Sequence, residues 1–359
     1  MPMRPDLIRE ARRQAEICNA CRYCEGFCSV FPALHRGRAF SDGDIAHLAN
    51  LCHDCRGCYY ACQYAAPHEF DVNLPQALSN VRRDSWKAHA WPTGLARLFD
   101  RSGVAMAAIL VLGFAALLAL SQALRPEDGE GFYSYMSHAL MVAIFAPAFV
   151  LPLVGLGISL RNYWRAVGGG SARWTDLRGA LASAGRMRNL EGGHGDGCNY
   201  EDGDRFTHAR RRFHQAALYG FLLCLASTSS GTILHYGFGI EAPYGPLSLP
   251  KLLGVPGGML LCAGTAGLAW LKTGADPDLG ANGAWGGEMA FVLLLFAVSA
   301  TGLALYAATG TRAVGMLLPI HLATVLAFFL LTPYSKMAHG FYRLAALTKE
   351  EANKRRARS

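Results

Sequence analysis

Six long apolar stretches run through the second part of the chain. They cover approximately 104–124, 138–160, 214–237, 252–271, 288–309 and 313–332 and contain almost no charged side chains. A helix of about 20 apolar residues is long enough to cross the roughly 30 Å hydrocarbon core of a bilayer. The pattern therefore predicts six membrane-spanning helices, with both chain ends on one side. Six buried helices of a large soluble protein are the alternative, which the near-full length of every stretch disfavours.

The first 100 residues contain no such stretch and are predicted to form a separate, mostly helical head. Ser41, followed by Asp42 and Asp44, is a typical N-cap for a helix that runs to about Asn50. Residues 74–87 also have a helical pattern, and neither segment alternates as a strand does. We expect an all-α protein, with a head over 1–100, a membrane domain over 101–345 that includes a loop at 161–213, and a basic tail over 346–359.

Charge distribution orients the predicted spans. The chain is 52% hydrophobic and only 17% charged, with 34 Lys and Arg against 26 Asp and Glu, a net charge of +8. Ten arginines lie in the loop at 161–213 and seven Lys or Arg lie beyond residue 332, whereas the opposite loops carry only Arg125, Lys251 and Arg312. Because cytoplasmic loops retain positive charge, the head and both termini are predicted to be cytoplasmic. Basic residues beside apolar spans indicate a lipid membrane, and no nucleic-acid partner is expected.

Eight of the eleven cysteines form two runs with the same spacing, C-x2-C-x2-C-x3-C. The N-terminal segment before them has no apolar signal region, which favours metal binding over disulfides. In such a run three thiolates bind one [4Fe–4S] cluster and the fourth reaches a neighbouring cluster. We therefore predict two crossed ligand sets, Cys18, Cys21, Cys24 and Cys62 on one cluster and Cys52, Cys55, Cys58 and Cys28 on the other. A pair of zinc sites, a single cluster or a three-iron cluster are the alternatives.

The three remaining cysteines are less informative. Cys224 and Cys262 lie within predicted spans and are expected to be small core residues. Cys198 lies in the loop at 161–213, where a redox or metal role and a structural thiol are both open.

Five histidines lie in or at the ends of the spans, where ionisable side chains are costly and often functional. His321 and His339 are separated by about 27 Å of helical rise, provided the helix continues past Pro333, and His214 and His235 by about 31 Å. Facing imidazoles at one depth can bind a b-type haem axially. We predict His214 with His339 near the cytoplasm and His235 with His321 toward the other face, while His138 could replace an outer ligand or serve a quinone site.

These motifs give the chain a family resemblance. With the two cysteine runs, G-C-N-Y before R-R-R-F-H-Q, then Y-G-F-L-L-C and A-P-Y, it resembles the tricarballylate utilisation protein B family and the C-terminal half of a related flavoprotein-fused cobalamin-biosynthesis protein. Residues 318–343 also resemble the last helix of the nitrate reductase gamma subunit, a haem b protein, which implies that His321 and His339 are haem ligands. The partner helix there carries two histidines ten residues apart. His214 matches the first, but Cys224 stands at the second, so His235 or His138 would supply the remaining ligand.

The resemblance implies an electron-transfer subunit of an oxidoreductase rather than a self-contained enzyme, without catalytic residues. It would pass electrons from a reduced cytosolic FAD-dependent dehydrogenase, similar to tricarballylate dehydrogenase, through two [4Fe–4S] clusters and one or two haems b to quinone. Its implied location is the bacterial cytoplasmic (inner) membrane. The alternatives are a subunit of a nitrate or heterodisulfide-type reductase and a redox-sensing transporter, although a transporter should carry paired charges inside its spans.

The arginine-rich loop at 161–213 and the head together are predicted to form the docking face for the flavoprotein, because a basic surface speeds encounter with an acidic partner. The alternative is that the arginines only orient the spans. Arg210, Arg211 and Arg212 border the bilayer and are expected to be anchors, whereas Arg186 and Arg188 lie farther out.

Overall fold

The computed structural model describes residues 2–123, 135–193, 195–199, 205–242 and 244–358, so Arg125 lies outside the described residues. Within these ranges the chain forms helices and no strand, and its β-type pairing is an isolated antiparallel bridge between Cys198 and Thr207. The prediction of an all-α protein is confirmed.

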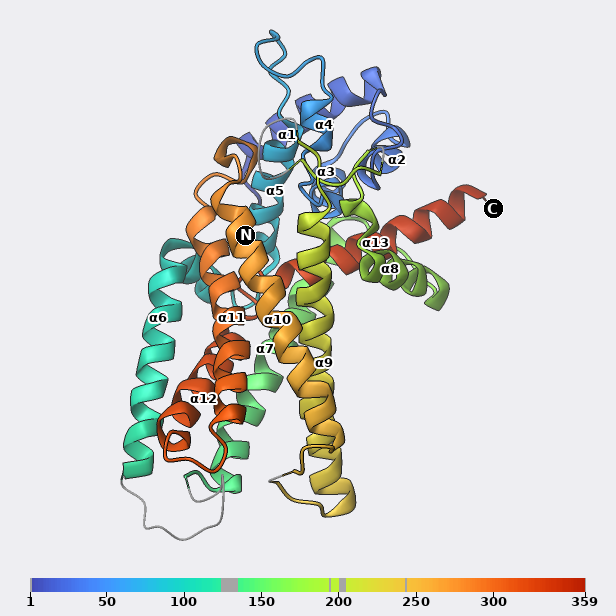
Figure 1. Ribbon diagram of the computed structural model, residues 1–359. Coiled ribbons are helices and arrows are strands. Elements are labelled where there is room, and N and C mark those ends of the chain that lie inside the picture. Colours follow the sequence, from blue (N-terminus) through green and yellow to red (C-terminus); the bar gives the residue numbers. More distant parts are fainter. Residues whose placement is uncertain (1, 124–134, 194, 200–204, 243, 359) are drawn as a thin grey trace.

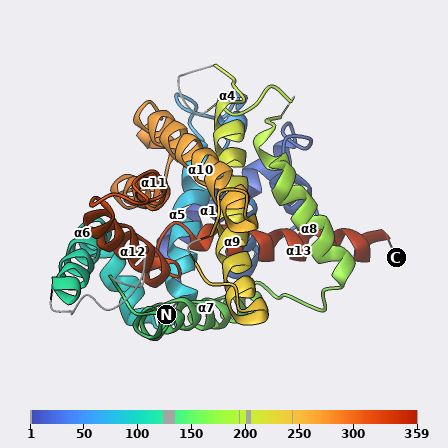
Figure 2. The ribbon, with the colours of Figure 1, turned by 60° about the horizontal axis from the view of Figure 1, so that its bottom comes forward.

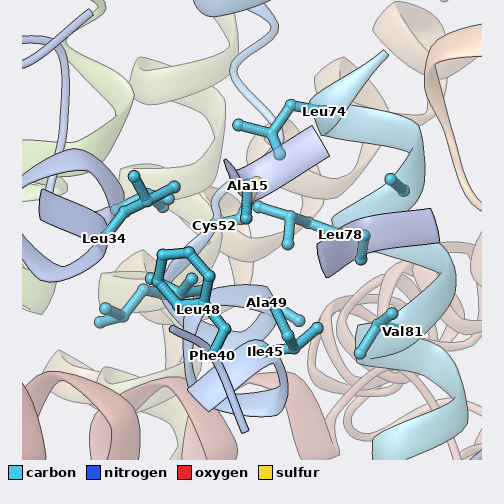
Figure 3. Close-up of a cluster of buried hydrophobic side chains, with 14 of the residues drawn as sticks. Ala15, Leu34, Phe40, Ile45, Leu48, Ala49, Cys52, Leu74, Leu78 and Val81 are labelled. Carbon is cyan, nitrogen blue, oxygen red and sulfur yellow. The ribbon is translucent and has the colours of Figure 1, made fainter. Parts of the chain in front are cut away.

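The head consists of five helices, α1 (Pro5–Cys21), α2 (Val30–His35), α3 (Asp42–Leu51), α4 (Gly57–Tyr60) and α5 (Leu74–His89). Ser41 caps α3 as predicted, and the side chain of Asp44 bonds back to the Ser41 backbone in a capping box. The helices enclose a core that includes Leu34, Ile45 and Leu78, each at most 1% exposed. Figure 3 shows Cys52 among these apolar side chains.

Six helices are long and apolar enough to cross a membrane, as predicted. They are α6 (Thr93–Ala123), α7 (His138–Ala166), α9 (Ala209–Phe238), α10 (Leu249–Thr273), α11 (Trp285–Ala307) and α12 (Val314–Leu331). The six run below the head in Figure 1. We call the end of this bundle that carries the head the head end, and the opposite one the far end.

Helix α9 packs along its length on α10 and makes few contacts with α7, α12 or α13 (Ala338–Arg358). Glycines allow the close approach, since a Cβ on Gly220 would lie 2.4 Å from the backbone nitrogen of Leu261, and one on Gly264 would lie 2.4 Å from that of Ala217. Helix α10 continues the contact to α11, and α12 packs on α6, α7 and α11.

The last apolar helix does not continue past Pro333. Helix α12 ends at Leu331, and α13 begins only at Ala338 after a turn. Figures 1 and 2 show α13 running across the head end of the bundle instead of extending α12. The condition under which His321 and His339 would share one helix is therefore not met, because proline removes a backbone donor and its ring disfavours a helical preceding residue.

The described parts of the loop at 161–213 and of the C-terminal segment contain helices that their composition did not indicate. The loop contains α8 (Trp174–Arg186) and the short helix η2 (Arg188–Leu190), and α8 packs against α13. Glu350 of α13 is fully buried and pairs with Arg36 of the head, and Arg355 forms an ion pair with Asp176 of α8 at 2.9 Å. Helix α13 thus connects the head to the loop.

Candidate metal centres

One set of four cysteines, Cys18, Cys21, Cys24 and Cys62, is called here the first group. These four, with Cys58, line a cavity of about 280 Å³ between α1, α4 and the start of α5. Burial raises the pKa of the Cys18 thiol to about 12, and the neighbouring thiols of Cys62, Cys24 and Cys21 add to the rise. The cysteine from the second run, Cys62, therefore lies with three cysteines of the first run.

The second group is Cys28, Cys52, Cys55 and Cys58. Burial raises the pKa of Cys58 well above its usual value, and the thiols that contribute next are Cys55, Cys52 and Cys28. The pKa of Cys28 also rises to about 12, mainly through burial and in part through Cys52. The chain thus brings together the two crossed sets that the spacing suggests, and their role as ligands stays a prediction.

The surroundings of both groups fit iron–sulfur clusters. Backbone N–H groups of Asp54 and Tyr64 donate to the sulfurs of Cys52 and Cys62, each at 3.4 Å, as they do around cluster thiolates. In the described residues no three His, Cys, Asp or Glu side chains converge on one metal ion. A cubane distributes its irons over four corners, so its ligands surround a volume instead of a point. Neutral buried thiols would release protons when iron binds.

Three arginines, called here the arginine cluster, lie beside the second group. Arg82 of α5 and Arg343 of α13 donate to the carbonyl of Cys52 at 2.8 and 3.0 Å, and Arg210 of α9 donates to the carbonyl of Asp54. Burial, followed by the charges of Arg82 and Arg210, lowers the pKa of Arg343 to about 9. Three crowded cations are stabilised by a nearby anion, and a cubane with four thiolates is such an anion.

The loop at 161–213 covers the second group. Asn189 accepts hydrogen bonds from the backbone and hydroxyl of Ser29, next to Cys28. Cys198 is fully buried near Cys55, and Asn199 donates its N–H to the Cys55 carbonyl at 3.0 Å. Cys198 therefore lies beside the predicted ligands, and its role as a structural thiol or as a redox or metal residue stays open.

Two of the predicted haem ligands, His214 of α9 and His339 of α13, face each other at the head end. Their ring centroids are 5.8 Å apart and the rings are inclined by 70°. Two metal–imidazole bonds of about 2 Å each, with the ring radii, require centroids roughly 6 Å apart. Nδ1 of His339 donates to the carbonyl of Lys336, which leaves Nε2 for a metal, and Nδ1 of His214 is buried with no hydrogen-bond partner among the described residues. These two residues fit a bis-imidazole haem site.

The outer histidines differ from the predicted pairing. His235 stacks on His138 with ring centroids 4.3 Å apart and an angle of 28°, so the structure brings His235 to His138 and not to His321. His321 instead contacts α11, where its Nδ1 lies 3.0 Å from Thr301 Oγ1. Rings stacked at 4.3 Å leave no space for an iron between them. The predicted pairing of His235 with His321 is not seen, because α9 packs on α10 whereas α12, which carries His321, packs on α6, α7 and α11. The ligand roles of His138, His235 and His321 stay predictions.

The sequence did not predict the arginine cluster, and the prediction that Arg210 and Arg211 only border the bilayer was incomplete. Arg210 reaches the head, and Arg211 forms an ion pair with Glu191 at 2.7 Å, so both hold the head or loop instead of only bordering the bilayer. Arg82, Arg210 and Arg343 are far apart in the chain, and no local pattern indicates that they meet.

Comparison with known proteins gives matches over most of the chain. Residues 104–359 match the family described as citrate utilization protein B, and residues 11–88 match the Fer4-like domain of citrate utilization protein B. The chain is similar to citrate utilization protein B of Escherichia coli, with 42% identity over 354 residues, 97% of this chain and 93% of that protein. No solved structure matches. The matches confirm the resemblance to the utilisation protein B family and the ferredoxin-like assignment of the head, whereas the haem b assignment of the membrane domain stays a prediction.

Proposed function

The chain belongs to the citrate utilization protein B family, and from this premise we propose that it is a membrane electron-transfer protein for organic-acid oxidation. Electrons enter from a reduced FAD-dependent dehydrogenase that oxidises a tricarballylate-like or citrate-like acid. They pass through two [4Fe–4S] clusters and haem b to quinone. The dehydrogenase performs the substrate chemistry, and this chain binds, orders and tunes the carriers.

The observation that carries the proposal is that one continuous structure joins both cysteine groups to the facing histidines. The arginine cluster contacts the second group, and two of its members lie four residues from the histidines, Arg210 from His214 and Arg343 from His339. One helical turn separates each arginine from its histidine. The second group therefore neighbours the haem site, and the first group lies farther toward solvent.

Local charge supports the direction of transfer. Positive charge beside an iron–sulfur cluster stabilises its reduced, more negative form and raises its reduction potential. The first group lies next to Tyr23, which is 65% exposed, and so has a surface at which a donor can approach. In this proposal the first group accepts electrons and the second group delivers them toward the membrane.

His214 and His339 hold the head-side haem, which supplies one-electron chemistry at membrane depth. The chain's own contribution is to fix the imidazoles, through the Lys336 carbonyl at His339 and through the packing of α9 on α10. Six apolar helices are compatible with a multi-pass membrane protein, and the proposed membrane is the bacterial cytoplasmic one, with the head and both termini in the cytoplasm.

The docking surface for the dehydrogenase is proposed to include the head and the exposed outer side of the loop at 161–213. Arg186 and Arg188 are exposed there, at the end of α8 and in η2. Their charges would attract an acidic partner surface over a distance that salt reduces.

The test is to purify the full-length protein, reduce it, and record optical and electron paramagnetic resonance spectra with iron and haem quantitation. We expect b-type Soret and α bands and about eight cluster irons per chain in addition to the haem iron. A preparation that retains its fold but contains no haem bands and no reducible cluster signal would refute the proposal. Purified dehydrogenase and its acid should then reduce the carriers in the absence of dithionite.

A further inference from the structure

A second cavity, of about 450 Å³, lies at the head end where the head meets the bundle. Its wall combines residues of α5, which include Arg82 of the arginine cluster, with the start of α6, the start of α11 and the turn between α12 and α13. Cavities of about 300–1,000 Å³ with a few convergent polar groups are typical of small-molecule sites. Neither the cysteine groups nor the facing histidines use this space.

Part of the cavity lining is polar and includes Arg82, Arg83 and Lys87 of α5. Lys336 also lines the cavity and pairs with Glu288, which binds Lys272 at 2.7 Å, and the Lys336 ammonium lies 5.7 Å from the ring centre of Trp86. An ammonium has three donors, and the pair with Glu288 uses one of them. The lining thus has hydrogen-bond donors for a carbonyl oxygen and an aromatic face for a planar ring.

Another part of the lining is apolar. It consists of Phe99, Gly103, Val104 and Ala105 of α6, at the start of the first apolar stretch. Val104 is 52% exposed, and lipid would surround this part of a spanning helix. A polar planar head with an apolar tail would match both parts of the lining, whereas a soluble carboxylate would leave the apolar part without a partner.

The cavity also borders the candidate haem site. Lys336 and Ala338 line it, and the Lys336 carbonyl accepts the hydrogen bond from His339 Nδ1. A molecule in the cavity would therefore be separated from His339, a predicted axial ligand, by the backbone around Lys336.

We propose that this cavity binds the head group of a membrane quinone, with the Lys336–Glu288 pair and Trp86 at the ring and α6 beside the isoprenoid tail. The inference rests on the proposed function and adds the acceptor site to it. Each quinone takes two electrons, which the chain delivers from the flavoprotein, and two protons from solvent at the head end. Both carbonyl oxygens become hydroxyls, and the quinol leaves along α6.

Gly287 allows a test that removes no charge and no hydrogen bond. It lines the cavity, and a Cβ placed on it meets no atom within 4 Å, so Gly287→Leu extends into the cavity. Gly113 of α6 also has open space but does not line the cavity, which makes Gly113→Leu the matched control. Ala105→Leu enlarges a cavity-lining side chain of α6 and serves as a second variant.

The experiment uses the purified full-length protein with its clusters and haem, and an azido-ubiquinone analogue as photolabel. In the wild-type protein we expect the label on peptides from α5, the start of α6 and the start of α11, with protection by unlabelled decylubiquinone. Gly287→Leu and Ala105→Leu should lose this label and reduce decylubiquinone roughly tenfold less efficiently in kcat/KM. Their iron and haem content and their reduction by dithionite should be unchanged.

Two results would overturn the assignment in distinguishable ways. If wild-type protein reduces the quinone while both variants keep the label and the rate of Gly113→Leu, the acceptor site lies elsewhere and the proposed function stands. If wild-type protein is reduced by its dehydrogenase but neither binds nor reduces quinone, quinone is not the acceptor, and this part of the proposed function falls together with the site.

Discussion

The first and second cysteine groups share one ligand spacing but have different surroundings. The first group lines a cavity near exposed Tyr23, whereas the second lies beneath the loop at 161–213 and beside Arg82, Arg210 and Arg343. Spacing decides which thiols can bind one cluster, and surroundings decide the potential of that cluster. Two equal motifs can therefore serve as an entry and an exit for electrons.

The largest effect is expected when the one ligand that each cysteine run contributes to the other group's cluster is removed. Cys62→Ala should abolish the cluster of the first group, although Cys62 belongs to the second run, and Cys28→Ala should abolish the cluster of the second group. Each variant should lose about half of its cluster iron, because each ligand set contains one cysteine of the other run. Iron analysis and paramagnetic resonance of the reduced protein measure this. Loss of the same signal in both variants would contradict the crossing.

The next test removes His339, one of the two facing histidines beside the second group. His339→Ala should lose the head-side haem and keep both clusters, because one axial imidazole cannot replace two. Haem content and cluster signals are the measurements. His138→Ala provides the contrast, since His138 lies at the far end against His235. Full haem in His339→Ala with haem loss in His138→Ala would show that the facing pair is not the site.

Arg343→Gln tests the cause of the difference between the groups. Removing a buried positive charge near Cys52 should lower the reduction potential of the second cluster by on the order of 50 mV. Arg22→Gln, at an exposed arginine beside Cys21, is the matched control and should leave both potentials nearly unchanged. Redox titration followed by paramagnetic resonance measures both. An equal shift in the two variants would exclude the arginine cluster as the cause.

A smaller effect is expected from charge reversal at the proposed docking surface. Arg186→Glu with Arg188→Glu should slow cluster reduction by the dehydrogenase a few-fold at low salt and weaken its dependence on ionic strength. Stopped-flow reduction at several salt concentrations is the measurement. An unchanged rate and an unchanged salt dependence would show that these arginines only orient the spans.

The smallest effect should come from Cys198→Ser. Cys198 lies beside Cys55 and its thiol contacts the Leu190 carbonyl at 3.6 Å. Because each cluster has four other thiols, the variant should keep its full iron content and both signals. Loss of one cluster would make Cys198 a ligand and would change the composition of the second group.

Local features of the sequence determined most of the helices and the grouping of the cysteines. The length of the apolar stretches was sufficient to predict the six long helices, because a run of about 20 apolar residues needs a nonpolar environment wherever it folds. The cap at Ser41 and the helix at 74–89 follow from neighbouring residues and formed as expected. The two cysteine runs also indicated which thiols would gather, since a fixed spacing limits what a short segment can reach.

Only the tertiary structure decided what surrounds these motifs. Arg82, Arg210 and Arg343 come from three helices and meet at Cys52 and Asp54. The turn that contains Pro333 directs α13 across the bundle, so that His339 faces His214, and the packing of α7 and α9 brings His138 onto His235. The physical reason is that spacing along a chain constrains only neighbours within a few turns. Contacts between distant helices depend on how each helix ends and packs, and one break at a proline redirects every side chain that follows it.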